Sequence, residues 1–147
     1  EAEWEYTCRA ESTTPYYWGN NLGISPRFCW TAENSGGHNH PAGSLCPNRW
    51  GLFDMHGSVS EWLTDIYHDE KTLPSNVDDT EMRFPEPEVK GGIVEENFEV
   101  IIRGGGAFSI VEKARSGARS GNLPFNGASQ GIGFRVARTI RVRPEHE

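Results

Sequence analysis

The first nine residues carry the clearest helical pattern in the chain. Their apolar side chains fall four positions apart in two pairs, Ala2 with Tyr6 and Trp4 with Cys8. Glu5 and Arg9 add a favourable charge pair at the same spacing, which places both partners on one face of a helix. The pattern predicts a helix over residues 1–9. Because no capping residue precedes it, we expect the chain to begin inside that helix.

The remaining pattern predicts short strands separated by long loops. Residues 9–50 are rich in turn-forming residues, and residues 65–92 are interpreted as an exposed acidic insertion. Three consecutive apolar residues predict a strand over residues 99–103, and residues 114–119 and 131–138 are expected to form closing strands. Aromatic residues in the first loop region are expected to act as buried plugs: Tyr16, Tyr17, Trp18, Phe28 and Trp30.

Composition agrees with one domain in which loops dominate. The chain has 147 residues, of which 17 are Gly and 9 are Pro, and this content predicts many turns and few long helices. The formal charge of −7 does not indicate a nucleic-acid-binding protein, because phosphate binding needs clustered Lys and Arg. No run approaches the roughly 20 apolar residues of a membrane helix. Arginine is concentrated from Arg103 onward, where we expect it to brace loops, with an anion site as the alternative. The compartment is left open.

The three cysteines and two of the histidines are candidate metal ligands. Cys8, Cys29 and Cys46 are odd in number and include no Cys-x-x-Cys pair, which argues against a zinc knuckle and a complete disulfide framework. Cys29 and Cys46 flank a Gly-rich loop and could pair or remain free. His38 and His40 lie two residues apart, but no third ligand is placed by sequence, so we favour a loop-bracing role.

Residues 51–62 place two carboxylates around a flexible turn. Asp54 and Glu61 flank Gly57 and Val59, and carboxylates together with backbone carbonyls form the oxygen shell that a hard cation such as calcium prefers. The alternative is that Asp54 caps a turn and Glu61 pairs with an arginine. Both interpretations use the same residues, and the sequence leaves both open.

Three short blocks in a fixed order point to a family. They are residues 51–62, Arg-Gly-Gly-Gly at residues 103–106 and Gly-Ile-Gly-Phe-Arg-Val at residues 131–136, with Glu-Ala-Glu-Trp-Glu-Tyr at residues 1–6. Together they resemble the formylglycine-generating enzyme family, also called the sulfatase-modifying-factor family. The resemblance implies an α+β, loop-rich variant of the C-type-lectin fold over residues 1–140, followed by a tail at residues 141–147. It also implies that this sequence corresponds to the C-terminal part of a longer domain, and whether the N-terminal part belongs to the same chain, to a partner or to neither is left open.

The resemblance sharpens the metal predictions. It implies a calcium site formed by the side chains of Asp54 and Glu61 and the carbonyls of Gly57 and Val59. The oxidases of this family bind copper through two cysteines shortly after the Arg-Gly-Gly motif, but residues 107–115 contain no cysteine. Some relatives also pair the helix cysteine with one after the Gly-Phe-Arg motif, a place taken here by Val136. We therefore expect no copper, assign no catalytic residue, and interpret Cys8 as a buried apolar residue.

The function expected from these features is a non-catalytic binding module, of the kind that bacterial relatives carry beside kinases or other domains. Its partner would be a protein, a peptide or a glycan bound on the loop face. The candidate surface residues are Ser109, Glu112, Lys113, Arg115, Asn122, Asn126 and Gln130. The alternative is an enzyme of the same family, either a formylglycine-generating oxidase or a relative of the sulfoxide synthases, which take their iron ligands from a separate helical domain.

Overall fold

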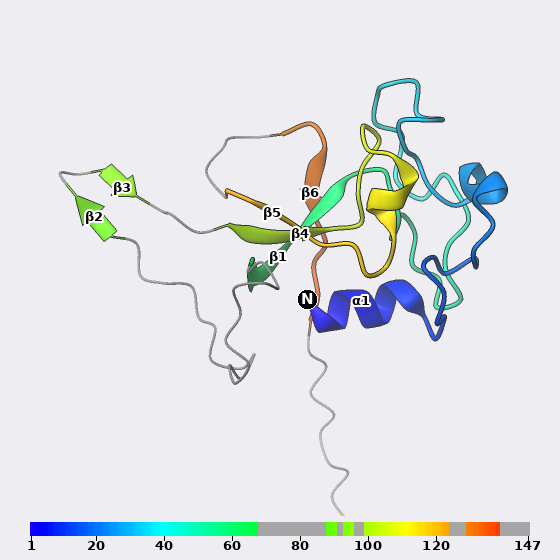
Figure 1. Cartoon of the computed structure of the whole chain (residues 1–147), viewed down its shortest axis with the longest axis horizontal. Coiled ribbons are helices and arrows are strands. Elements are labelled where there is room, and N and C mark those ends of the chain that lie inside the picture. Colours follow the sequence, from blue (N-terminus) through cyan, green and yellow to red (C-terminus); the bar gives the residue numbers. More distant parts are fainter. Residues whose placement is uncertain (68–87, 91–92, 96–98, 124–128, 139–147) are drawn as a thin grey trace, which may run out of the picture.

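The computed structural model describes residues 1–67, 88–90, 93–95, 99–123 and 129–138 (Figure 1). The tail predicted at residues 141–147 lies outside these ranges. One α-helix, two short 3-10 helices and six strands follow one another along the described chain. In order they are α1 (Ala2–Arg9), η1 (Leu22–Arg27), β1 (Ser60–Ile66), β2 (Glu88–Lys90), β3 (Ile93–Glu95), β4 (Val100–Arg103), η3 (Val111–Ala114), β5 (Ser120–Asn122) and β6 (Ile132–Phe134). None of the described helices is long and apolar enough to cross a membrane.

Four of the strands form the central sheet, in the order β5-β4-β1-β6. Strand β4 is antiparallel to both β1 and β5, whereas β6 runs parallel to β1. The register sets Glu61 of β1 opposite Arg103 of β4 on one side and Gly133 of β6 on the other. Strands β2 and β3 pair separately as an antiparallel hairpin. Most connections are loops, so the expected α+β, loop-rich class is confirmed.

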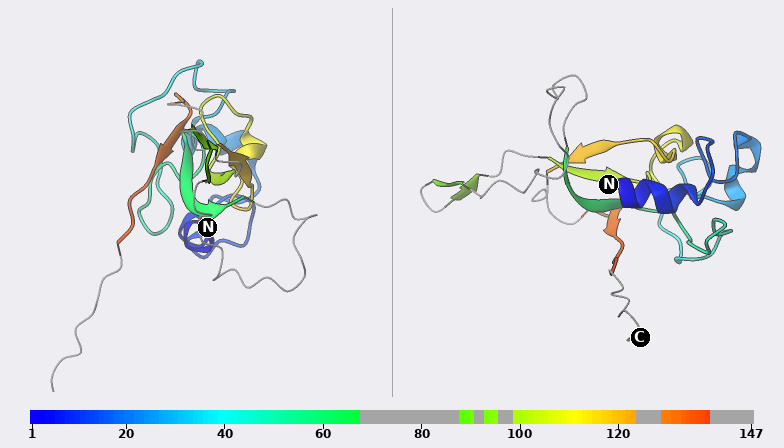
Figure 2. Two further views of the ribbon diagram at one scale, coloured as in Figure 1. Left: turned by 90° about the vertical axis from the view of Figure 1, so that its left-hand side faces the viewer. Right: turned by 90° about the horizontal axis from the view of Figure 1, so that it is seen from below.

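Helix α1 confirms the predicted helix and anchors the first core cluster. It ends at Arg9 because Ala10 adopts the left-handed conformation, with φ of 44°, and donates its backbone N–H to Tyr6 O. Trp4 and Cys8 are buried with Met55, whereas Tyr6 is 66% exposed and packs edge-on against Trp50. The two apolar pairs of the sequence pattern therefore face opposite environments. Figure 2 shows α1 lying alongside the strands.

The aromatic residues of the first loop region supply a second core cluster. Tyr16 is buried with Cys29 and Val111, and its ring stacks on Trp18 at 4.6 Å. Trp18 in turn stacks on Phe28 at 5.1 Å. Of the five aromatic residues predicted as buried plugs, Tyr16 is buried and the other four are half-buried, so the prediction holds fully only for Tyr16.

The predicted strand positions were only partly right. Strand β4 confirms the prediction for residues 99–103. The strand expected over residues 114–119 was wrong, since η3 ends at Ala114 and β5 begins only at Ser120. The last predicted strand is shorter than expected, with β6 covering Ile132–Phe134 alone.

A buried arginine joins α1 to the sheet. Arg103 is only 1% exposed, and its Nη2 atom donates to Glu5 Oε2 at 2.5 Å and to Ser116 O at 2.7 Å. Its guanidinium also lies 5.3 Å from the centre of the Trp4 ring. Burial acts to raise the pKa of Glu5, but the hydrogen bonds from Arg9 and Arg103 outweigh it and lower that pKa. Glu5 therefore stays ionised beside the buried arginine.

Candidate functional site

Residues 54–58 form a tight loop held against two neighbouring segments. Asp54, Gly57 and Ser58 all have positive φ, at 57°, 74° and 66°. Gly57 donates its N–H to Gly104 O at 2.7 Å, and Ser58 donates to Trp30 O at 2.8 Å. A Cβ at residue 57 would lie 2.3 Å from Trp30 O. Only glycine fits this approach, which explains why the flexible residue lies between the two acids.

The two acids of this loop have separate partners. Glu61 is buried, and its Oε2 accepts from Trp4 Nε1 at 2.7 Å and from Arg135 Nε at 3.1 Å. Its Oε1 accepts from Arg135 Nη2 at 2.7 Å, so the guanidinium group binds both carboxylate oxygens, through Nε and Nη2. Arg135 Nη2 also donates to Phe53 O, and Asp54 Oδ2 accepts from Gly43 N at 2.7 Å.

This arrangement bears on the predicted calcium ligands, Asp54, Gly57, Val59 and Glu61. Both oxygens of Glu61 already accept hydrogen bonds, and within the described ranges no three His, Cys, Asp or Glu side chains gather as a metal site. The predicted shell has only two carboxylates, with carbonyls as its other ligands, so this search does not test it. A calcium ion would have to compete with Arg135 for the carboxylate of Glu61, and the calcium site stays a prediction.

The Arg-Gly-Gly segment after β4 is shaped by close backbone contacts. Gly104 and Gly105 have φ of 90° and 67°, and a Cβ on Gly105 would lie 3.0 Å from the backbone of Ala114. Ala107 donates its N–H to Ser58 O at 2.8 Å. These contacts confirm the close backbone approach that the glycines predict. They also fix the path of the loop that carries the candidate surface residues.

A hollow of about 250 Å³ lies between this loop and the sheet. Its lining comes from three strands and the loop: Ser60, Ile102, Arg103, Gly105, Ser109, Lys113, Ala118 and Ser120. Ser109 and Lys113 belong to the predicted ligand-binding surface, whereas Ser60 and Ser120 do not. No local sequence pattern indicates that β1 and β5 lie on either side of β4. The hollow can offer several hydroxyl groups and one primary ammonium group to a ligand.

The other predicted surface residues are not all part of this hollow. Glu112 and Arg115 are exposed at the start and just beyond the end of η3, and Asn122 lies in β5. Gln130 is exposed, and its carbonyl accepts from Asn39 Nδ2 at 2.5 Å. Asn126 lies outside the described residues. The structure therefore brings Ser109 and Lys113 together at one hollow and leaves Gln130 with the residue 39 loop.

Cys8 and His56 form the closest approach of a thiol to a base in the described structure. Cys8 Sγ lies 3.6 Å from His56 Nε2 and 3.7 Å from Ser116 Oγ, and all three residues are fully buried. His56 Nδ1 donates to Ala114 O at 2.5 Å, while Nε2 accepts from Tyr17 N at 3.3 Å. Burial raises the pKa of Cys8 to about 12 and lowers the pKa of His56 to about 4. The pair is thus neutral and structural.

The remaining cysteines and histidines also have structural surroundings. All three cysteines are free, so Cys29 and Cys46 do not pair, and burial raises the pKa of Cys29 to about 12. His40 stacks on Trp30 with ring centres 3.7 Å apart, and its Nε2 lies 2.9 Å from Ser35 O. His38 lies beside His40, with ring centres 4.5 Å apart. These contacts agree with the loop-bracing interpretation of the two histidines.

Sequence comparison places the chain in a family. The model of the family described as "Sulfatase-modifying factor enzyme 1-like domain" matches residues 1–140, so the chain belongs to the sulfatase-modifying-factor family. It is 30% identical to the formylglycine-generating enzyme of Mus musculus, over 93% of this chain and 37% of that protein. It is also 30% identical to the serine/threonine-protein kinase pkn1 of Chlamydia pneumoniae, over 95% of this chain and 20% of the kinase.

Solved structures agree with the family and the fold. Treponema denticola variable protein 1 superposes with a TM-score of 0.69 at 26% identity, over 90% of this chain and 44% of that one. The structure of PvdO from Pseudomonas aeruginosa gives 0.65 at 30% identity, over 90% of this chain and 48% of that one. The C-type-lectin-like fold expected from the sequence is therefore confirmed. The chain spans less than half the length of each of these relatives.

Proposed function

We propose that this chain is a non-catalytic binding module of the sulfatase-modifying-factor family, which holds a peptide, protein or glycan on its loop face. The observation that carries the proposal is the hollow of about 250 Å³ lined by Ser109 and Lys113. Hydroxyl groups from β1, the loop and β5 converge there, and they suit a ligand that both donates and accepts hydrogen bonds. Lys113 adds a positive charge that favours an acidic group on the ligand.

The chemistry of the thiols supports a binding role over oxidation. Copper oxidation in this family needs two thiolates in the loop after Arg-Gly-Gly, and no cysteine lies in residues 107–115 or among the described residues lining the hollow. Cys8 lies instead near the end of α1, beside Ser116, and its raised pKa disfavours the thiolate form. The role of this chain would be recognition by a preformed surface.

The occurrence of a similar domain within a larger protein supports the same proposal. The match to pkn1 covers one fifth of a protein whose name states a kinase activity, so a domain similar to this chain occurs there beside other sequence. An accessory module would supply binding while the neighbouring domain supplies the activity.

The second candidate is an enzyme of the same family, because a formylglycine-generating enzyme shares 30% identity over 93% of this chain. A sulfoxide synthase relative is a further form of that candidate, and it would need iron ligands supplied by another domain. In either case the ligands of the catalytic metal would have to come from residues outside the cysteine-free loop of residues 107–115. The binding module requires no such addition.

A binding screen tests the proposal directly. The 147-residue chain would be applied to a glycan array and a peptide library, in parallel with Lys113→Glu and with Arg27→Gln as a control. Arg27 is exposed at the end of η1 and is not part of the hollow. The proposal expects a glycan or peptide that binds the parent chain and Arg27→Gln but loses at least tenfold in affinity for Lys113→Glu. No binder, or binders that ignore Lys113→Glu, would overturn it.

A further inference from the structure

A second hollow, of about 280 Å³, lies at the C-terminal end of α1. It is lined by Arg9 at the end of the helix, by Thr13, Thr14 and Pro15 of the following turn, and by Arg115 and Gly117 beyond η3. Only Arg115 also belongs to the loop face described above. Two guanidinium groups therefore border one small hollow in a chain whose formal charge is −7.

Arg9 is fixed in place along one edge of this hollow. Its Nε donates to Glu5 Oε1 at 2.8 Å, and its Nη1 donates to Thr14 O at 3.0 Å. Its Nη2 lies 2.7 Å from Glu5 Oε1 and 3.6 Å from where a Cβ on Gly117 would stand. Each Nη carries two hydrogens, so one on each remains for a ligand after these contacts. The side chain is held in position before any ligand arrives, which reduces the entropy cost of binding.

Arg115 is held only at its base. Its Nε donates to Glu112 O at 2.9 Å, and no further hydrogen bond joins this side chain to the described residues. The two Nη atoms of an exposed arginine with a fixed Nε form a fork that can bind two oxygens of one anion. Thr13 is exposed, lines the same hollow and adds a hydroxyl group.

The neighbouring acids do not neutralise these arginines. Glu5 contacts both Arg9 and the buried Arg103, and Glu1 contacts Arg103 and Arg119, so two carboxylates face three guanidinium groups. Glu11 pairs with Arg49 at 3.1 Å, on the other side of the turn. Glu112 is exposed and meets Arg115 through its main-chain carbonyl. An excess of positive charge remains around the hollow.

We propose that this hollow binds a phosphoryl group, held between Arg9 and Arg115 with Thr13 completing the contacts. A tetrahedral group with several charged oxygens can accept from both guanidinium groups at once, which a single carboxylate does less well. Gly117 leaves space beside Arg9 Nη2 for the group, and Glu5 Oε1, which is paired with Arg9, lies 4.0 Å from where a Cβ on Gly117 would stand and borders the same space. The phosphoryl group would belong to a phosphorylated peptide segment or to free phosphate.

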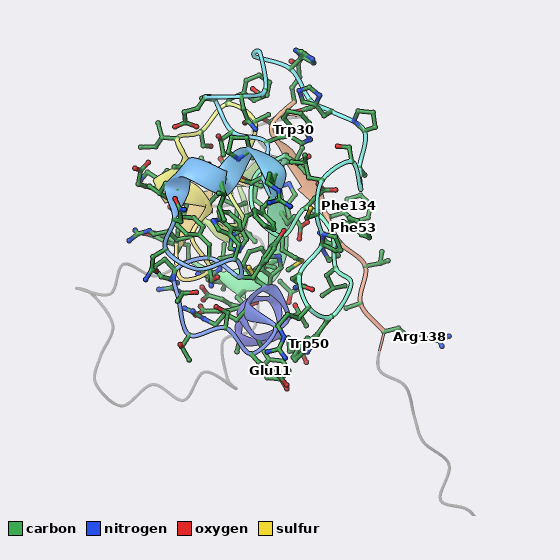
Figure 3. All side chains as sticks on the ribbon, turned by 90° about the vertical axis from the view of Figure 1, so that its right-hand side faces the viewer. Glu11, Trp30, Trp50, Phe53, Phe134 and Arg138 are labelled. Atoms are coloured by element: carbon green, nitrogen blue, oxygen red, sulfur yellow. The ribbon has the colours of Figure 1, made fainter. Side chains whose placement is uncertain are left out.

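The structure supplies two variants that remove the site by different means. Arg115→Gln removes one guanidinium from an exposed position. Gly117→Val fills the space beside Arg9 and keeps every charge, and residue 117 does not have the positive φ that would strain a side chain. Arg138→Gln is the matched control, because Arg138 is exposed on the segment beyond β6 and points away from the body of the molecule (Figure 3).

The test is a titration of the 147-residue chain with inorganic phosphate at constant ionic strength, followed by backbone amide NMR. Acetate serves as the comparison anion, and a phosphoserine peptide with its unphosphorylated form distinguishes a peptide source from free phosphate. The proposal expects saturable shifts at Thr13, Arg115 and Gly117, with affinity reduced roughly tenfold or more in Arg115→Gln and Gly117→Val. Arg138→Gln should bind like the parent chain.

Three results would overturn the proposal. They are the absence of saturable shifts with phosphate, equal responses to phosphate and acetate, and equal weakening in Arg115→Gln and Arg138→Gln. Melting curves of each variant check that the fold is retained. Because Lys113 does not line this hollow, failure of the binding module at Lys113 and failure of the phosphoryl site give different results.

Discussion

His56 should make the stability of this protein fall as the pH drops below 7. The residue is fully buried beside Cys8, and its Nδ1 donates to Ala114 O. Burial is the largest cause that lowers its pKa, Arg9 adds a smaller repulsion, and the bond to Ala114 O acts in the opposite direction. The folded-state pKa is about 4, against an ordinary value of 6.5.

The sign follows from which state binds the proton. Between the two pKa values the unfolded chain is protonated at His56 and the folded chain is not, so acid favours unfolding. The stabilising contribution is complete above pH 6.5 and is lost as the pH falls toward 4. With a difference of two to three pKa units, linkage gives a loss of about 2 kcal/mol between pH 7 and pH 5. That is a large part of the stability of an ordinary domain.

The assay is urea unfolding at several pH values between 7 and 5, a window chosen to lie above the range in which most carboxylates titrate. His56→Gln removes the titrating group and should flatten the pH dependence, whatever its effect on stability at pH 7. His38→Gln, at an exposed position, should keep the slope of the parent chain. A parent chain with no loss of stability in this window, or a His56→Gln variant with an unchanged slope, would refute the reasoning.

Three further outcomes are expected. Gly57→Ala should destabilise the fold by more than about 2 kcal/mol, because residue 57 has a positive φ and its new Cβ would clash with Trp30 O. Gly51→Ala should cost less, because residue 51 has a similar φ but open space around it. Equal losses of unfolding free energy in urea would contradict this. Glu61→Ala should cost about 1–3 kcal/mol, because it leaves the buried Trp4 N–H without its acceptor, whereas the Arg135 side chain is 34% exposed and can be solvated by water; urea unfolding with no measurable loss would contradict this. The calcium prediction expects added calcium to raise the melting temperature of the parent chain but not that of Asp54→Asn. A melting temperature that changes with neither calcium nor chelator would contradict the calcium prediction.

Local sequence patterns predicted the parts of the fold that depend on nearby residues. The i,i+4 pairs identified α1, the apolar run identified β4, and the glycines after Arg103 indicated the close backbone approach. The strand expected over residues 114–119 was wrong because the tight contact of Gly105 with Ala114 is made by a 3-10 turn, and β5 starts later. A pattern within one segment does not show which neighbour the segment must pack against.

The candidate site depends on contacts between residues far apart in sequence, and local sequence patterns do not predict such contacts. Sequence left open whether Glu61 pairs with an arginine, and it could not name Arg135, which lies 74 positions away. The meeting of Cys8 with His56 and Ser116 was likewise unforeseen, since three separate segments supply them. The serines of β1 and β5 became lining residues only once the strand order was known.

The central claim is that this member of the family binds without oxidising, and one measurement tests it most directly. The chain would be incubated with copper, oxygen and a peptide containing Cys-x-Pro-x-Arg, and the peptide would be examined by mass spectrometry for conversion of its cysteine to formylglycine. A copper-only sample is the control. The cysteine-free loop of residues 107–115 predicts no aldehyde above that control. Formylglycine that accumulates in proportion to the amount of the chain would contradict the claim and make the protein an oxidase.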